Sequence, residues 1–253
     1  MLIDTHCHIN FPDKFPDPAA VVEEAKAAGV TRMIAVGCDP ESSCQAVELA
    51  EQFKAVYAVV GWHPTYTKDY TRASLDEIEQ MLSHPKVVAL GEIGLDFHWD
   101  YATPEQQYAA LSDQLELAKR TQTPIVFHCR EAYPQLLDIL ELRQPHPYLL
   151  HCFAGDLADA ARAVRLGAMF GVDGPITYKN GQQLRDTIRQ IPHDRLVVET
   201  DSPYMPPVPF RGQANKPAYV ALVNAGLAAA LGTTPEACAE LTTRNAERFF
   251  RLD

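Results

Sequence analysis

Two histidines stand two positions apart near the start of the chain, in the stretch MLIDTHCHIN. Residues two apart in a strand point to the same side, so His6 and His8 should face together while Cys7 faces the other way. Paired imidazoles are common in metal sites, but this spacing alone is a weak signal. Its meaning depends on whether further ligands follow along the chain.

Other ionisable side chains follow short apolar runs, at the point where each run ends. They are Glu92, His128, His151, Glu199 and Asp201. A lone histidine in such a place is usually structural, and a lone carboxylate is usually a helix cap or a solvated charge. Burying this many polar groups at one rim without partners would be costly, however. The repeated pattern therefore predicts a metal site.

The predicted donor set, four imidazoles and two carboxylates, exceeds the three protein ligands of a typical catalytic zinc. It suits two cations about 3.5–4 Å apart that share a bridging carboxylate. The expected groups are His6, His8 and Asp201 for one ion, His128 and His151 for the other, and Glu92 between them. Imidazole suits zinc or manganese better than magnesium, so the identity of the ions stays open among Mg, Mn and Zn.

Eight short apolar runs recur along the chain, and amphipathic stretches separate them. The runs are MLID, RMIAVG, AVYAVVG, VVALGE, PIVFHC, YLLHC, AMFGV and RLVVET. Each is bounded by Gly, Pro or polar residues, as buried parallel strands are. The clearest helical patterns cover residues 17–29, 103–121, 156–167 and 237–252.

This alternation predicts an α/β fold, a (β/α)8 TIM-type barrel that forms one domain over residues 1–253. In such a barrel the carboxyl ends of all strands converge on one mouth, where these enzymes bind their ligands. An open doubly wound sheet is the alternative, because periodicity does not show closure. The chain lacks the GxGxxG and GxxxxGK[ST] patterns of common nucleotide-binding sheets.

Composition narrows the function classes. The net charge of −11 argues against broad nonspecific adhesion to nucleic acid, although a local site remains compatible with it. We see no signal-peptide pattern and no apolar run long enough for a membrane helix. The six cysteines form no CxxC pair, so we expect reduced thiols in a cytoplasmic protein that does not contact membranes.

Several motifs occur in a fixed order: IDTHCH, GWHP, GEIGLDF, PIVFHCREA, LLHCFAG, GPITYKN and VVETDSPYMPP…RGQANKP. In these motifs, and over essentially its whole length, the chain resembles the TatD family of metal-dependent deoxyribonucleases, within the amidohydrolase superfamily. The resemblance implies a barrel that hydrolyses phosphodiester bonds of DNA, as a 3′–5′ exonuclease acting on single strands or 3′ ends. It implies the same ligand set, in a family usually described as magnesium-dependent. One departure is Thr65, where family members often have a second histidine after the His-Pro pair.

Three residues would carry the chemistry of such a hydrolase. Bound cations would lower the pKa of a water molecule, and Asp201 would accept its proton. Glu92 would bridge the cations, and His63 would donate a proton or a hydrogen bond to the phosphate. The alternative for His63 is that it only anchors the turn at Pro64. Glu199 points to the same side as Asp201 and would orient a ligand.

Cationic and aromatic side chains after the predicted strands are candidates for substrate contacts. The candidates for binding phosphate are His63, Arg130, Lys179, Arg211 and Lys216. The candidates for stacking on the bases of a single strand are Trp62, Trp99, Tyr101, Tyr133 and Phe153. Ordinary loop packing is the alternative for each aromatic residue.

Two other functions share the predicted metal site. One is an amide or ester hydrolase of the wider superfamily, acting for example on aminoacyl-tRNA or a cyclic amide. A lysine on the fourth strand, able to become carbamylated, would favour that reading, whereas the chain has Glu92 there. The other is a non-catalytic metal-binding protein. The complete donor set with Asp201 argues against it, because structural sites tend to be closed.

Overall fold

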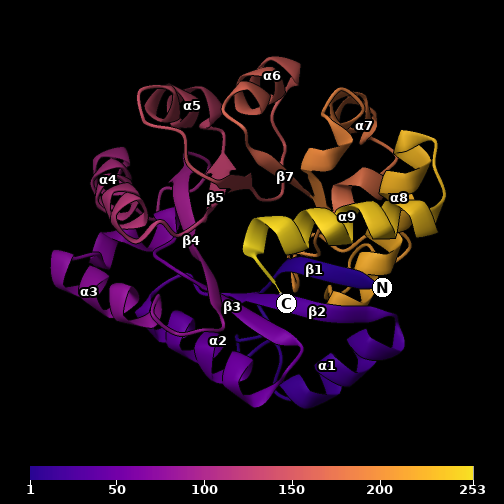
Figure 1. Cartoon of the computed structure of the whole chain (residues 1–253), viewed down its shortest axis with the longest axis horizontal. Helices are drawn as coiled ribbons and strands as arrows, with labels where there is room; N and C mark the ends of the chain where they lie inside the picture. The colour runs from indigo at the N-terminus through magenta and orange to yellow at the C-terminus, as the bar shows by residue number, and fades with distance from the viewer. Residues whose placement is uncertain (253) are drawn as a thin grey trace.

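The computed structural model describes residues 1–252, in which eight parallel strands follow one another in chain order around a barrel (Figure 1). The strands are β1 (Leu2–Cys7), β2 (Val30–Val36), β3 (Val56–Val60), β4 (Val87–Asp96), β5 (Ile125–Arg130), β6 (Tyr148–Leu150), β7 (Met169–Val172) and β8 (Leu196–Val198). Each coincides with one of the predicted apolar runs. The (β/α)8 prediction is confirmed, and the open doubly wound alternative is wrong.

Helices follow the strands and form the outer layer (Figure 1). They are α1 (Pro18–Ala27), α2 (Pro40–Gln52), α3 (Arg72–Met81), α4 (Pro104–Thr121), α5 (Tyr133–Glu141), α6 (Leu157–Arg165), α7 (Gln182–Ile188), α8 (Val220–Leu231) and α9 (Pro235–Phe250). Short 3₁₀ helices are η1 (Pro64–Asp69), η2 (Gly174–Thr177), η3 (His193–Arg195) and η4 (Pro217–Tyr219). Across residues 1–252, no single helix is long and apolar enough to cross a membrane; residues 217–231 and 235–250 pass that test only as a pair bent by 106°.

Local side chains set where the predicted helices begin. The Asp17 carboxylate accepts the backbone N–H of Ala20 at 3.0 Å, which caps α1 directly before its first proline. Thr103 caps α4 and exchanges hydrogen bonds with Gln106, a capping box, again just before a proline. The Asp-Pro and Thr-Pro signals therefore act as the sequence suggested.

The segment that follows β8 closes the barrel by pairing with β1. The backbone N–H of Asp201 donates to the carbonyl of His6 at 2.9 Å, and that of His8 donates to the carbonyl of Ser202 at 2.8 Å. Cys7 and Ser202 form a parallel bridge at the same place. Closure therefore brings the two N-terminal histidines beside Asp201, which lies almost two hundred positions later in the chain.

The barrel interior is packed at the amino ends of the strands. Every strand contributes to one buried apolar cluster: Ile3, Ile34, Val36, Val59, Ala89, Val126, Leu149, Met169 and Val197. Phe249 and Phe250 of α9 belong to the same cluster, and Thr243 of that helix donates to the carbonyl of Met1. α9 thus covers the amino end of the barrel, and the opposite end is left for polar groups.

Two register shifts decide which side chains enter the barrel mouth. Ile3 packs inside the barrel, and Cys7 packs with the outer cluster beneath the helices, because the register shifts between Asp4 and Cys7. A second shift lies between Leu90 and Ile93, so that the residues after it change sides. Such irregularities re-aim side chains at barrel rims. They turn His6, His8 and Glu92 toward the interior.

Candidate metal centre

The six predicted ligands meet at the carboxyl end of the barrel, and Glu92 of β4 lies at their centre. One of its oxygens, Oε2, faces Nε2 of His6 at 3.3 Å and Nε2 of His8 at 4.0 Å. The other, Oε1, lies 2.8 Å from Nδ1 of His128 and 2.7 Å from Nε2 of His151. Each carboxylate oxygen therefore faces one of the two predicted donor groups.

Asp201 joins the donor group on the Oε2 side of Glu92. Its Oδ1 lies 3.4 Å from Nε2 of His8 and 3.8 Å from Nε2 of His6. The backbone of Asp201 has a φ of 55°, in the left-handed region that residues other than glycine seldom adopt. This conformation is held by the pairing with β1 and occurs at a residue of the site, as such strain often does.

Hydrogen bonds at the outer edge of two rings set which nitrogen faces the centre. His8 donates its Nδ1–H to the carbonyl of Val36 at 2.9 Å. His128 donates its Nε2–H to Oδ2 of Asp96 at 2.8 Å. Carbonyl and carboxylate oxygens only accept here, so in the neutral form of each ring the other nitrogen carries no hydrogen and turns a lone pair inward. This is the tautomer that a metal ligand needs.

Asp96, at the end of β4, is a functional residue that the sequence analysis missed. It is 1% exposed, and its Oδ1 accepts the backbone N–H groups of His98 at 2.9 Å and Trp99 at 3.0 Å. Burial alone would raise its pKa, but the hydrogen bond from His128 and these amides lower the pKa below its usual value. The signal was present in GEIGLD, where Asp96 stands an even number of residues after Glu92 on the same strand.

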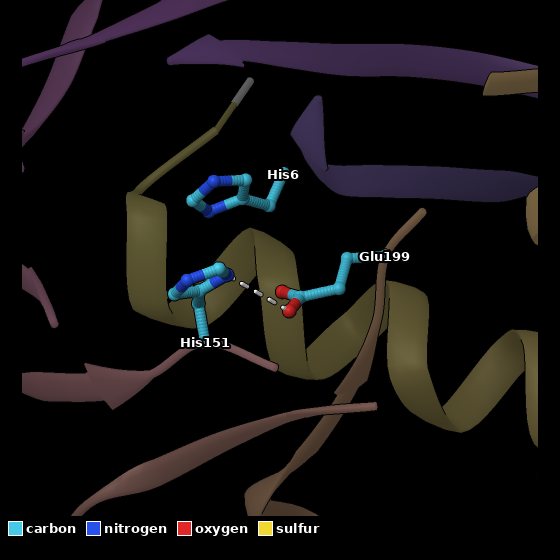
Figure 2. A group of neighbouring side chains, drawn as sticks. All are labelled: His6, His151 and Glu199. Carbon is cyan, nitrogen blue, oxygen red and sulfur yellow. Dashed lines mark ion pairs between the residues drawn. The ribbon is translucent and has the colours of Figure 1, made fainter. Parts of the chain in front are cut away.

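Glu199 faces the ring of His151 on the side away from Glu92. Figure 2 shows the ring of His6 over that of His151, and Glu199 reaching toward His151. The two rings are stacked, with centroids 3.9 Å apart. Oε1 of Glu199 faces Nδ1 of His151 at 3.4 Å and also accepts the backbone N–H of Cys152. Thr5 donates to the second oxygen at 3.3 Å. His151 therefore also points Nε2 inward.

The residues of the centre fit divalent cations. Both nitrogens of His6 are buried without a hydrogen-bond partner, and Oε1 of Glu92 lies 2.8 Å from Nδ1 of His128. A cation placed among these groups would accept the lone pairs of the neutral rings and pair with the charge of the carboxylate. Burial alone would raise the pKa of Glu92, but the surrounding histidines, His151 foremost, hold it well below its usual range, so the carboxylate is ionised.

Three overlapping donor groups have the spacing of metal ligands. They are His6, His8 and Glu92; His63, Glu92 and His128; and His6, His151 and Glu199. Glu92 belongs to two of them, which fits a carboxylate shared between cations. His63 thus lies inside the centre, and its side chain is 12% exposed.

The predicted phosphate-binding cations have different surroundings. Arg130 and Arg211 are exposed, and each guanidinium lies over an aromatic ring, 5.6 Å and 3.9 Å from its centroid respectively. Lys179 is exposed in the loop between η2 and α7. Lys216 forms an ion pair with a glutamate of α1, and its role as a phosphate ligand stays a prediction.

The aromatic candidates divide by exposure. Trp62, Tyr133 and Phe153 are 6%, 6% and 1% exposed, so they belong to the packing of the barrel, which was the alternative to base stacking. Trp99 and Tyr101 are 44% and 60% exposed. Their rings stack on each other with centroids 5.5 Å apart and an interplanar angle of 12°. A preformed aromatic pair therefore stands beside the centre, on the loop that Asp96 anchors.

Comparison with known proteins places the whole chain beside one family. A family model described as TatD related DNase matches residues 3–251. The chain is 38% identical over 255 residues to an uncharacterized metal-dependent hydrolase, YabD, of Bacillus subtilis (strain 168), and the match covers 100% of both. It is 34% identical over 239 residues to the 3′-5′ ssDNA/RNA exonuclease TatD of Salmonella typhimurium, with 92% of each covered.

Solved structures show the same fold. The crystal structure of YjjV, a TatD homolog from Escherichia coli K12, superposes with a TM-score of 0.94 and 36% sequence identity. The match covers 100% of this chain and 98% of that one. An organophosphorus hydrolase from Deinococcus radiodurans has a TM-score of 0.61 and 18% identity, which shows a shared fold alone.

Proposed function

The chain belongs to the family of TatD-related DNases and is a metal-dependent hydrolase, and on that premise we propose that it is a 3′–5′ exonuclease of single-stranded DNA. We propose further that the reaction uses two divalent cations. The observation that carries this proposal is the position of Glu92, whose two oxygens face two separate groups of donors. The polarity and the single-stranded substrate are supported by the name of the Salmonella relative.

The proposed ligands divide as the two faces of Glu92 divide. The first cation would be held by His6, His8 and Asp201, the second by His128 and His151, and both by Glu92. Such cations supply an acidified water and neutralise charge on the scissile phosphate. Mg, Mn and Zn all remain candidates, since the donors mix imidazole with carboxylate.

The chain itself would supply the base. Asp201 is the site carboxylate that water reaches most readily, because its side chain is 13% exposed and that of Glu92 is 3% exposed. We assign to the carboxylate of Asp201 the acceptance of the proton from the attacking water. Asp96 and Glu199 hold the rings of His128 and His151 in place during that step.

The surface beside the centre suits a single strand. Bases that are not paired expose their faces, and exposed aromatic rings such as Trp99 and Tyr101 bind them by stacking. Arg130, whose guanidinium lies over the ring of Trp99, would contact the connecting phosphates. This local cationic and aromatic surface is compatible with the overall net charge of −11.

The experiment starts from protein stripped of metal, to which Mg²⁺, Mn²⁺ or Zn²⁺ is returned in turn. Activity is followed on single-stranded DNA labelled at the 3′ or the 5′ end, beside an ester and an amide substrate. We expect metal-dependent loss of the 3′ label first, and no turnover in Glu92→Gln or Asp201→Asn, while Glu236→Gln on the far end of the barrel acts as the wild type does. Normal metal-dependent cleavage by either site variant would refute the assignment.

A further inference from the structure

His63 differs from His8 and His128 in the hydrogen bond made by the ring nitrogen that faces away from the metal centre. This nitrogen accepts in His63, whereas it donates in the other two rings. The backbone N–H of Thr65 donates to Nδ1 of His63 at 3.2 Å, and Oγ1 of Thr65 lies 2.7 Å from the same nitrogen. A backbone amide can only donate, so Nδ1 carries no hydrogen and accepts. The ring hydrogen must then be on Nε2, and the Thr65 hydroxyl is a second donor to Nδ1.

The Nε2–H of His63 points into the metal centre. Nε2 lies 3.6 Å from Oε1 of Glu92, and the ring is in edge-to-face contact with that of His128, with centroids 4.4 Å apart. In their neutral forms, His8 and His128 turn lone pairs toward this space, because their outer nitrogens donate to oxygen. His63 instead turns a hydrogen toward it.

A hydrogen on Nε2 of His63 is incompatible with metal binding through that nitrogen. A ligand nitrogen needs its lone pair, so the ring hydrogen of His63 would have to move to Nδ1. There it would face the amide hydrogen of Thr65, from a nitrogen only 3.2 Å away. The spacing of His63, Glu92 and His128 resembles that of a ligand group, but the hydrogen bonding of His63 contradicts that role.

The turn after β3 builds this arrangement. His63 is the N-cap of η1, and its side chain accepts the Thr65 amide in the way that cap residues accept the first amides of a helix. Pro64 occupies the first position of η1 and restricts the backbone between the two residues. The ring and its donor are thus fixed relative to each other by three consecutive residues.

We propose that Thr65 is a positioning residue that holds His63 in the Nε2–H tautomer, so that His63 enters the centre as a hydrogen-bond donor and not as a metal ligand. The acceptor would be an anionic oxygen of the substrate, such as a nonbridging phosphate oxygen. This identification of the acceptor rests on the proposed phosphodiesterase function. The tautomer and the absence of metal ligation do not.

The tautomer is measured by long-range ¹H–¹⁵N correlation spectra of histidine-labelled, metal-free protein. We expect Nε2–H for His63 in the wild type and in Thr65→Ser, which keeps the hydroxyl. Thr65→Val removes one donor and leaves the amide, so the tautomer ratio should shift by about two- to tenfold toward Nδ1–H. Thr67→Val is the matched control, since Thr67 donates to the carbonyl of Pro64 in the same turn and does not contact His63.

The spectra decide the first half of the proposal. An Nδ1–H or doubly protonated His63 in the wild type would overturn it. So would a Thr65→Val spectrum identical to that of the wild type, because the hydroxyl would then have no part in holding the ring. Neither reading requires that the protein cleave DNA.

Metal binding and kinetics decide the second half. In calorimetric titration with Mn²⁺, His63→Ala should bind the metal with the stoichiometry and affinity of the wild type. His8→Ala should lose one binding step. Loss of a binding step in His63→Ala would refute the donor role. On single-stranded DNA, His63→Ala should lower kcat by about 100-fold, the effect of removing one donor to a developing anion. Thr65→Val should lower kcat by a smaller factor and leave KM unchanged, and Thr65→Ser should have the kcat of the wild type. Equal losses of kcat in Thr65→Val and Thr67→Val would show a purely structural effect and refute the positioning role.

Discussion

Replacing Asp96 with asparagine should weaken one cation site while the barrel stays folded. Asparagine keeps the shape of the side chain and one acceptor oxygen, which the amides of His98 and Trp99 would occupy. Its NH₂ group would then face Nε2 of His128 and donate to it. That bond forces the ring hydrogen onto Nδ1, which lies 2.8 Å from Oε1 of Glu92, where the second cation would bind.

The expected losses of metal affinity and turnover follow from replacing a partner that accepts the ring hydrogen of His128 with one that donates to the ring. Removing the group that orients a metal-bound histidine lowers metal affinity or activity by about 10–100-fold, which corresponds to about 1.4–2.7 kcal/mol. Turnover should fall further than affinity, because an asparagine that inverts a histidine tautomer in the Ser-His-Asp triad lowers kcat by about 10⁴-fold. We therefore expect a loss of turnover of about 10²–10⁴-fold.

The assay is calorimetric titration of metal-free protein with Mn²⁺, followed by turnover on single-stranded DNA. One binding step should weaken in Asp96→Asn while the other is retained, and circular dichroism should match the wild type. Glu131→Gln is the control, because it removes the charge only from the exposed contact between His98, after β4, and Glu131, after β5, at 2.7 Å. Wild-type affinity in both steps for Asp96→Asn would refute the tautomer argument.

Two further predictions concern the substrate surface and Glu199. Trp99→Ala should weaken binding of a single-stranded oligonucleotide by about 1–3 kcal/mol, the contribution of one stacked base. Hydrolysis of a small phosphodiester should stay unchanged. Equal losses on both substrates would contradict the stacking role. Gly171→Ala would place a Cβ 2.3 Å from Oε2 of Glu199, so the carboxylate must move away from His151. We expect lower turnover and a destabilisation of about 1–3 kcal/mol in thermal unfolding, and an unchanged kcat would show that Glu199 does not orient His151.

Much of the fold could be predicted from the sequence because its signals are local. Apolar runs bounded by Gly, Pro and polar residues mark all eight strands, and Asp17 and Thr103 mark helix starts through bonds within one turn. The candidate donors were visible for the same reason, since each stands at the polar end of an apolar run. That His6 and His8 face together depends only on the two-residue period of a strand.

The surroundings of several side chains could not be read in this way. Lys216 was a candidate for binding phosphate, and it pairs with Glu24, a residue 192 positions away that no local pattern connects with it. Trp62 and Trp99 both follow a strand, yet one is 6% and the other 44% exposed. Their exposure depends on which helix packs over each loop. The sequence around each tryptophan does not predict that packing.

The sequence by itself determined the identity of the donors, the order of strands and helices, and the pairing of His6 with His8 on one side. Only the tertiary structure decided that this side faces the barrel interior, because alternation counted from the inward-facing Ile3 would place His6 beneath the helices. The register shift between Asp4 and Cys7 reverses that direction, and the contact of Asp201 with β1 completes the centre. Both depend on hydrogen bonds between distant strands, whereas periodicity reports only the steric preferences of neighbouring residues.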